Sequence, residues 1–514
     1  MARNRIRPDA ALVLWIALVA IIAGLPASRA AVAMLAALPE AGFDIQWMLL
    51  LKTLAWAVGI GLAATLLALP IALASRGLTA RWSPLAVLPI LLPMPLAYAG
   101  LNLFRAPGTA LGDWLAMGPS WRAVAAGRLV AVLSLALWST ALAAPILALG
   151  LRTIDRTLPE SAALAGAGRW RRLTLTLAGM RASIIASAAV VAVVMTGSAI
   201  PLHLAQINTY SITLWLELDA TPAAGVGRVW LAATPVLLIA IAASAVISTA
   251  VARAAKRTDD PLAPPASSWP AIAVGLVIIA AASLAPLALL ARELTTLDTF
   301  SILWRTESDA VIQSAIVAAC VGIVCALVAW VARVLATDRP RAVAIGLVFL
   351  LVTSLAPGVL VGSAVAASWR WLPDVGDSPA ILVLAHLARL SALAALLGIL
   401  IAAAEPPSRR DARALDGATG LVGSLRASGD AALALAVGLI AAAMSLGEIE
   451  ASVVVQPPGA ESVARSMLNM LHFARYEHLS GLVLLVAAPA LLLGGIAWIL
   501  IALGRTLNRR HAFR

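Results

Sequence analysis

Three charged residues, Arg389, Glu448 and Glu450, fall inside long apolar stretches of the chain. A charged side chain at the centre of a membrane-crossing helix costs roughly 3 kcal/mol, so it pairs with another charge, faces a cavity or marks a pathway. On helices, Arg389 would lie roughly 15 Å and Glu448 roughly 10 Å from matching ends of their stretches. We therefore expect Arg389 to pair with Glu448 or Glu450, either as architecture or in contact with a substrate.

Glu448 and Glu450 are two positions apart in the sequence. On a continuous helix, residues with this spacing point to nearly opposite sides. We therefore expect at most one carboxylate to face Arg389, while the other finds water, the pathway or another donor.

The remaining reactive residues form no pattern that indicates catalysis. Neither lysine of the chain, Lys52 or Lys256, follows a glycine-rich phosphate loop, and no Ser-His-Asp set or paired-carboxylate cleft is evident. Several side chains between apolar stretches could ligate a hard metal cation, but their spacing matches no ligand motif. These residues are Tyr210, Glu461, Tyr476, Glu477, His203, His472 and His478. We expect a non-enzyme chain with no metal site and no cofactor.

A short string occurs twice, with an acid first and a glycine six positions later. It begins at Glu160 and again at Asp411, an offset of 251 residues, and each copy lies in a basic loop between apolar runs. The small residues after each acid would leave a bare helical surface that a partner can approach closely. The positions concerned are Glu160, Ala162, Ala163 and Gly166 in the first copy and Asp411, Ala412 and Gly417 in the second.

The composition shows which solvent surrounds these elements. Of 514 residues, 62% are hydrophobic and only 12% are charged, which is too apolar for a water-soluble core. Apolar runs of roughly 18 residues or more predict about twelve membrane-crossing helices. The expected spans are Ala10 to Ser28, Thr53 to Ser75, Trp82 to Phe104, Leu129 to Leu151, Ala182 to Leu216, Val229 to Ala252, Pro261 to Ala291, Ala310 to Ala332, Ala342 to Trp369, Ser378 to Ala404, Ala431 to Val455 and Leu479 to Gly504.

The arginines indicate the orientation of these spans. Most lie in the N-terminal segment and in alternate loops on the same side, which predicts that both termini and both repeated strings are cytoplasmic. The net charge of +12 then reflects basic loops that meet anionic lipid, so no nucleic-acid partner is expected. Because span follows span after Arg3, Arg5 and Arg7, we interpret the first apolar run as a retained helix.

The arrangement indicates an internal duplication. Six expected spans precede a segment rich in Pro, Ser and charge, 253–269, and six follow it. We expect a first six-helix repeat over 1–252, a second over 270–504 and a cytoplasmic tail over 505–514. The longest cytoplasmic loops, 152–182 and 404–430, occupy the same place in each repeat and hold the two strings. An even number of spans keeps both repeats in one orientation, so a pathway can form between them.

With these features the chain resembles the inner-membrane permease of a binding-protein-dependent ABC importer, in the fused two-repeat form of ferric-iron and thiamine systems. The family's coupling loop starts Glu-Ala-Ala with Gly three residues later, which Glu160, Ala162, Ala163 and Gly166 match apart from Ser161. Asp411, Ala412 and Gly417 match it more loosely, and both copies lack the usual closing Leu-Pro. The run Ser445-Leu446-Gly447-Glu448, followed by Pro457-Pro458-Gly459, is similar to the last repeat of the iron type.

The resemblance implies the ABC importer permease fold, all α-helical and polytopic, in the bacterial inner membrane. It also implies two copies of a separate ATPase subunit docked on the two loops and a periplasmic solute-binding protein that delivers the substrate. Ferric iron is the first expectation for that substrate and thiamine the second.

Two alternatives from other classes remain open. An ion-gradient-driven carrier of two six-helix halves would share the span count, but it should carry a stronger basic signature between its second and third spans and charges in several helices. A membrane enzyme acting on lipid-linked substrates would need acids or histidines clustered at one face. A neighbouring reading frame for an ATPase and a secreted binding protein would discriminate these possibilities.

Overall fold

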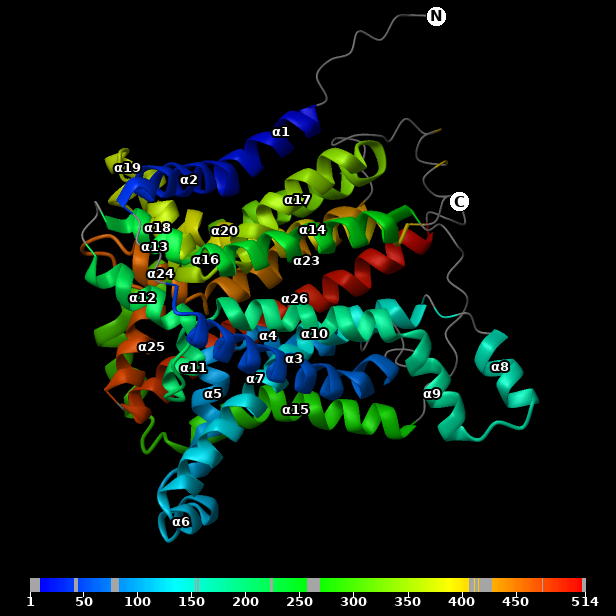
Figure 1. Ribbon diagram of the computed structural model, residues 1–514, viewed down its shortest axis with the longest axis horizontal. Coiled ribbons are helices and arrows are strands. Elements are labelled where there is room, and N and C mark those ends of the chain that lie inside the picture. The colour runs from blue at the N-terminus through cyan, green and yellow to red at the C-terminus, as the bar shows by residue number, and fades with distance from the viewer. Residues whose placement is uncertain are drawn as a thin grey trace, which may run out of the picture.

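The computed structural model describes residues 10–40, 45–74, 83–152, 154, 157–221, 225–256, 269–405, 411, 415, 428–473 and 475–510. Within this part of the chain the regular elements are all helices, and most run roughly side by side in one bundle (Figure 1). Helix α1 (Ala10–Val19) begins, and α26 (Tyr476–Arg510) ends, toward the end of the bundle from which α8 (Thr157–Leu164) and α9 (Arg169–Gly179) project.

The described chain contains eight helices long and apolar enough to cross a membrane, or up to eleven if each of three bent helix pairs is one span. It is therefore a multi-pass α-helical membrane protein. Every expected span overlaps a helix, but α23 (Ser428–Ser445) has an apolar part, Gly429–Ser445, shorter than the other candidates. The unbroken single spans are Ala10–Ala37, Trp47–Ala74, Ser120–Leu151, Thr234–Ala252, Trp269–Arg292, Asp298–Asp338, Ala380–Ala403 and Tyr476–Leu507.

Two expected spans are sharply bent rather than straight. The first bends by 86° between α4 (Leu88–Leu91) and α5 (Met94–Asn102), and the second by 113° between α17 (Pro340–Leu355) and α18 (Gly358–Trp369). Each bend lies at a proline, Pro93 or Pro357, and the residue before it is extended. Proline lacks the amide hydrogen that a helix needs and forces its predecessor out of helical geometry. The continuous runs expected from apolarity alone are wrong here.

A second kind of break also occurs twice. Helix α10 (Arg181–Gly197) stops and α11 (Ile200–Leu204) starts; likewise α23 stops and α24 (Glu450–Val455) starts. The residues that precede the new helices lie 250 positions apart and have nearly the same backbone angles, φ −96° and ψ −49° at Ala199 against φ −97° and ψ −44° at Ile449. The expected span Ala431 to Val455 is thus interrupted, and the two halves of the chain repeat the same interruption.

Helices from the two sequence halves are interleaved. The first helix, α1, packs against α16 (Asp298–Asp338) and α17 of the second half, whereas α15 (Trp269–Arg292) packs against α3 (Trp47–Ala74) and α5 of the first. Helix α14 (Thr234–Lys256) also packs against α17. The boundary at residues 253–269, of which 257–268 lie outside the described part, therefore separates repeats in sequence but not two independent bodies.

The breaks of one half touch those of the other. A Cβ atom on Gly197 would lie 2.9 Å from the Leu355 carbonyl oxygen, and one on Gly447 would lie 2.5 Å from Pro93 Cγ. Gly197 ends α10 of the first half beside the second-half bend, and Gly447 follows α23 of the second half beside the first-half bend. These close approaches require glycine, and they place the four breaks at the interface between the halves.

We expect Gly447→Ala to destabilise the protein by about 1–3 kcal/mol, because the added methyl group overlaps the Pro93 ring and the packing must shift. Gly59→Ala is the matched control, since a Cβ there meets nothing within 4 Å, and alanine favours the helix by about 0.5–1 kcal/mol. Thermal unfolding in detergent measures both. Equal midpoints for the two variants would contradict the packed contact.

Candidate functional site

Arg389 lies on α20 (Ala380–Ala403) and reaches the broken end of α17. Its Nη1 donates hydrogen bonds to the carbonyl oxygens of Ser354 at 2.8 Å and of Ala356 at 2.7 Å. Both carbonyls are released from helical bonding because Pro357 ends the helix. The C-terminus of a helix carries partial negative charge, so a guanidinium there is favourable. Arg389 therefore stabilises the bend and brings a positive charge into the bundle.

Two carboxylates face this guanidinium. Glu448 Oε1 lies 3.7 Å from Arg389 Nε, and Glu450 Oε2 lies 4.0 Å from Arg389 Nη2. The expectation that at most one acid would face Arg389 is wrong, because it assumed a continuous helix. Helix α23 ends at Ser445 and α24 begins only at Glu450, so the two acids do not lie on one continuous helix and both can turn toward Arg389.

Glu450 also spans the two halves of the chain. Its Oε1 accepts hydrogen bonds from Ser198 Oγ at 3.0 Å, from the Ala199 amide at 2.8 Å and from the Ile200 amide at 3.4 Å. These groups form the start of α11, where free amides and partial positive charge favour an anion. Negative and positive groups therefore alternate along a line. The negative end of α17 contacts Arg389, Arg389 faces Glu450, and Glu450 accepts from the positive end of α11. A charged contact thus joins two helix breaks from opposite halves.

In the first half, a neutral side chain satisfies the carbonyl that the proline bend releases. Trp138 lies 251 positions before Arg389, and its Nε1 donates a 2.7 Å hydrogen bond to the carbonyl of Leu92, which precedes Pro93 as Ala356 precedes Pro357. The positions 250 residues before Glu448 and Glu450 hold Ser198 and Ile200. The two halves are alike in backbone, but the charges lie on the second-half side.

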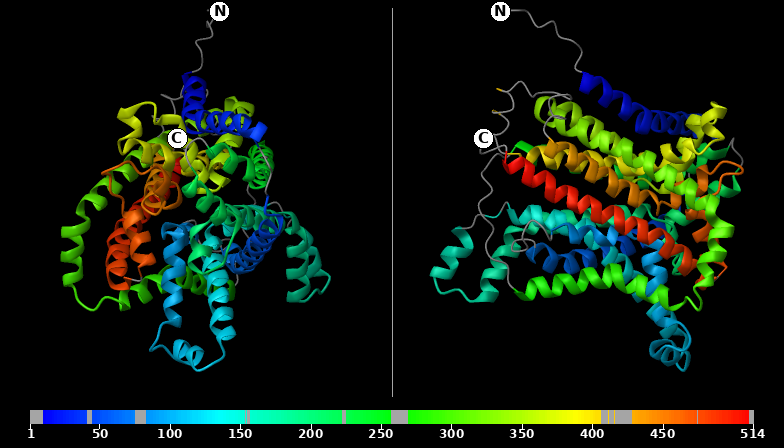
Figure 2. Two further views of the ribbon diagram at one scale, coloured as in Figure 1. Left: turned by 60° about the vertical axis from the view of Figure 1, so that its left-hand side comes forward. Right: turned by 180° about the vertical axis from the view of Figure 1, so that it is seen from behind.

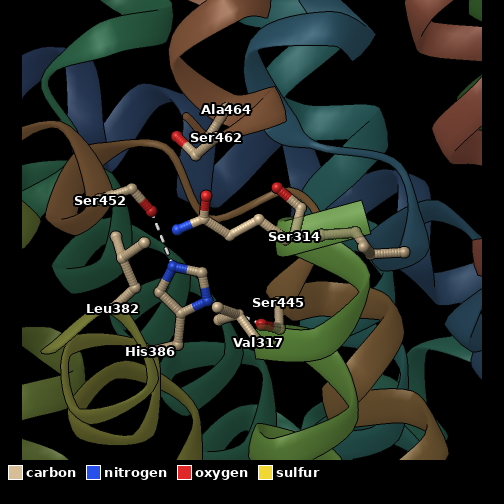
Figure 3. A pocket seen from close by; sticks show the side chains of 10 residues that line it. Ser314, Val317, Leu382, His386, Ser445, Ser452, Ser462 and Ala464 are labelled. Atoms are coloured by element: carbon tan, nitrogen blue, oxygen red, sulfur yellow. Dashed lines mark hydrogen bonds between the residues drawn. The ribbon is translucent and has the colours of Figure 1, made fainter. Parts of the chain in front are cut away.

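One turn before Arg389 on α20, the His386 ring lies between two serine hydroxyls. Its Nδ1 is 2.7 Å from Ser445 Oγ and its Nε2 is 2.7 Å from Ser452 Oγ (Figure 3). The ring lines a cavity of about 10 Å³, roughly the space of one water molecule. Ser314 and Ser462 line the same cavity. Leu135 holds the corresponding place in the first half, so this polar pocket is a second-half feature as well.

Sequence reasoning singled out Arg389, Glu448 and Glu450 but missed His386. The sequence did contain a signal for His386. A histidine three positions before Arg389 in an apolar span shares a helix face with that arginine. Among the described residues, no group of three or more His, Cys, Asp or Glu side chains could hold a metal ion. The Tyr210 hydroxyl donates to the Ala232 carbonyl, and Glu477 accepts from Thr295 and Thr299.

The first repeated string lies in α8 and in the tight turn that links α8 to α9. Helix α8 ends where Gly166 takes φ +77°, with the Ala167 amide bonded to the Ala162 carbonyl and the Gly166 amide to that of Ala163. This is a Schellman arrangement, in which glycine supplies the left-handed conformation. Ala163 and Leu164 are exposed, while Ala162 is half-buried. The side chain of Glu160 lies outside the described residues, although its backbone belongs to α8.

The second string is described only at Asp411, which is helical and exposed, and at Leu415; Ala412 and Gly417 lie outside the described residues. The two ends of the loop 404–430 are held together by ion pairs between buried side chains. Arg333 Nη2 lies 3.3 Å from Glu405 Oε2 and 2.6 Å from Asp430 Oδ2. The positions 251 residues earlier hold Ile154 and Gly179, which carry no charge, and a Cβ atom on Gly179 would lie 3.4 Å from Ile154 Cγ1. The same place in each half is therefore tied by different chemistry.

Comparison of the chain with protein-family models, curated proteins and solved structures gives no match.

We expect Arg389→Met to lower stability by about 3–5 kcal/mol, because it leaves buried carboxylates without a counter-charge. Trp138→Phe is the control at the equivalent position and should cost about 1–3 kcal/mol, the cost of one unsatisfied carbonyl. Adding Glu448→Gln and Glu450→Gln to Arg389→Met should restore part of the loss. Unfolding in detergent gives the ranking, and an Arg389→Met variant as stable as the native protein would refute the pair.

Proposed function

We propose that this chain is the membrane-crossing permease subunit of an ABC importer, with twelve spans in two six-helix repeats and both termini in the cytoplasm of a bacterium. The observation that carries the proposal is the α8 elbow. It projects from the bundle, exposes Ala163, ends in the left-handed Gly166 and belongs to a string repeated 251 residues later. A short helix with small side chains fits a groove on another protein, since backbone and partner can approach closely.

The path from this elbow into the bundle supports the same proposal. Helix α9 continues into α10 with a bend of 63°, and α10 ends at Gly197, beside the α11 amides that Glu450 accepts from. In the second half α23 starts from the other loop and leads to Glu448. Movement of the α8 elbow, or of the matching loop 404–430 in the second half, would therefore act on the charged contact between the halves. A pair of ATPase subunits that closes beneath both elbows would rock the halves between two access states.

The substrate class follows from the charges near this contact. The two carboxyl groups share a single guanidinium, so whenever both are ionised the cluster carries an excess of negative charge that would attract a cation. Ferric iron remains the first candidate and thiamine the second, since both are cationic. A periplasmic binding protein would supply the substrate, and the permease would need only a weak, transient site.

An ion-gradient-driven carrier is the second candidate. Arg389, Glu448, Glu450 and His386 lie close together within the bundle, an arrangement that proton-coupled carriers also use. The repeated string favours the importer, because a carrier has no partner protein that must bind two matching loops. Uphill uptake by the purified chain alone in vesicles, driven by an ion gradient without ATP, would establish the carrier and overturn the importer.

We expect uptake to require ATP and a co-reconstituted ABC ATPase, and a size series at Ala163 tests the docking role. Ala163→Ser should retain uptake, whereas Ala163→Trp should reduce uptake and ATP hydrolysis at least tenfold, because a large side chain prevents close approach. The residue is exposed, so neither change should alter unfolding. Equal uptake by both variants would show that α8 is not the docking helix. Gly166 is unsuited to this test because its left-handed backbone disfavours any side chain.

Glu450→Gln tests the substrate class. The amide oxygen can still accept from Ala199 and Ser198, so the helix break should persist while one negative charge is lost. We expect uptake of a cationic substrate to fall about tenfold or more with little change in unfolding temperature. Growth of a deletion strain on limiting ferric iron and on limiting thiamine, rescued by native or variant chain, identifies the cation. Failure of native chain to rescue either would remove both candidates.

A further inference from the structure

A hairpin between α5 and α7 (Ser120–Arg152) projects sideways from the bundle and ends in the short helix α6 (Ala110–Ala116). It runs across the direction of α3 and α15 rather than along it, and it remains the outermost feature on that side in each view (Figures 1 and 2). Its surface is rich in large exposed apolar side chains. These are Phe104, Leu111, Trp114, Met117 and Trp121.

Internal hydrogen bonds give the hairpin a defined shape. The Arg105 guanidinium joins its two legs, donating to Asn102 Oδ1 at 2.9 Å and to the Ala123 carbonyl at 2.7 Å. Thr109 caps α6 by accepting from the Gly112 amide at 3.0 Å, and it donates to the Phe104 carbonyl at 2.7 Å. The exposed apolar residues are therefore held on a built surface rather than on a loose loop.

These side chains form one face with a charged border. Trp114 on α6 and Met117, the residue that caps its C-terminus, are three positions apart and share a side, while Gly112 and Leu115 are buried against the rest of the hairpin. Met117 is 82% exposed. The Arg122 guanidinium lies 5.0 Å from the Trp114 ring centre and 6.0 Å from that of Trp121. Tryptophan and arginine in this combination are typical of the headgroup layer, where aromatic rings and cations both find partners.

The position of the hairpin indicates a bilayer as the occupant of this face. The hairpin lies near the ends of the membrane-crossing helices that are remote from α8 and α9 (Figure 1). Two large apolar side chains at the start of α3, Trp47 and Met48, are also exposed. A rigid apolar face that runs across the spans near their ends would lie along the surface of a membrane that they cross.

We propose that the α6 hairpin is a membrane-surface anchor, with Trp114, Trp121 and Met117 inserted among phospholipids and Arg122 at their phosphate groups. It occupies the leaflet opposite the elbows. Because α5 begins at the Pro93 bend, the anchor sets the depth of that bend, which Gly447 of the other half contacts. This role is independent of whether ATP or an ion gradient drives transport.

A nitroxide at Met117→Cys tests the anchor. The two native cysteines are first replaced, as Cys320→Ser and Cys325→Ala, and the full chain is placed in vesicles of phosphatidylethanolamine and phosphatidylglycerol without any other protein. We expect the label to be several-fold more accessible to oxygen than to an aqueous nickel chelate. Leu111→Cys provides a second apolar position, about 60° around the helix from Trp114. Ala116→Cys, exposed about 160° around the helix from Trp114, should show the greater nickel access.

Equally high nickel access at positions 117, 111 and 116 would place the hairpin in water and overturn the proposal. A label at 117 shielded from both oxygen and nickel would mean that a second copy of the chain covers the face, which also overturns it. Trp114→Ser combined with Trp121→Ser should move the label at 117 toward nickel access, while an unchanged profile would show that these rings do not hold the hairpin in the lipid.

Discussion

The structure depends on the rule that a backbone polar group surrounded by lipid must find its partner inside the protein. Four helix breaks in this bundle release carbonyls and amides that an unbroken helix would have satisfied. Arg389 takes two carbonyls at one break, Trp138 takes one at another, and Glu450 takes the amides at a third. Because Glu450 and those amides come from opposite halves, that break is satisfied only when the halves are assembled. The same contact that permits the bends also holds the repeats together.

Rigid and adjustable contacts are distributed differently along the helices. Where α10 crosses α3, a Cβ on Gly61 would lie 2.4 Å from the Ala188 carbonyl oxygen, and where α23 crosses α16, one on Gly438 would lie 2.5 Å from the Gly322 carbonyl. Such close crossings resist sliding, because interiors are densely packed. The ion contacts of Arg389 with the two acids, at 3.7 and 4.0 Å, are longer than hydrogen bonds and can rearrange. Any movement of α10 would therefore carry α3 with it, and any movement of α23 would carry α16, so that change would be concentrated at the broken ends of α10 and α23.

The sequence predicts the helical class, a helix within every expected span and a contact between Arg389 and one of the two acids, because apolar length and buried charge are properties of single segments. The count of twelve spans stays a prediction, since the described helices give eight to eleven. It does not predict that Trp82 to Phe104 and Ala342 to Trp369 bend. Both prolines were visible, but whether a proline bends or ends a helix depends on what receives the freed carbonyls. It also does not predict that both acids turn toward Arg389, since that follows from the end of α23 at Ser445. The interleaving of α1 and α15 has no local signal at all.

The exchange of Trp138 for Arg389 has a consequence for how such a chain can arise. A membrane protein assembled from two identical subunits would carry either two guanidiniums or two indoles at these places, and so either two sets of charges or none. Joining both copies in one polypeptide lets each position mutate alone. One half can then carry charged side chains at a helix break while the other keeps a neutral support, although the backbone angles at Ala199 and Ile449 are nearly the same.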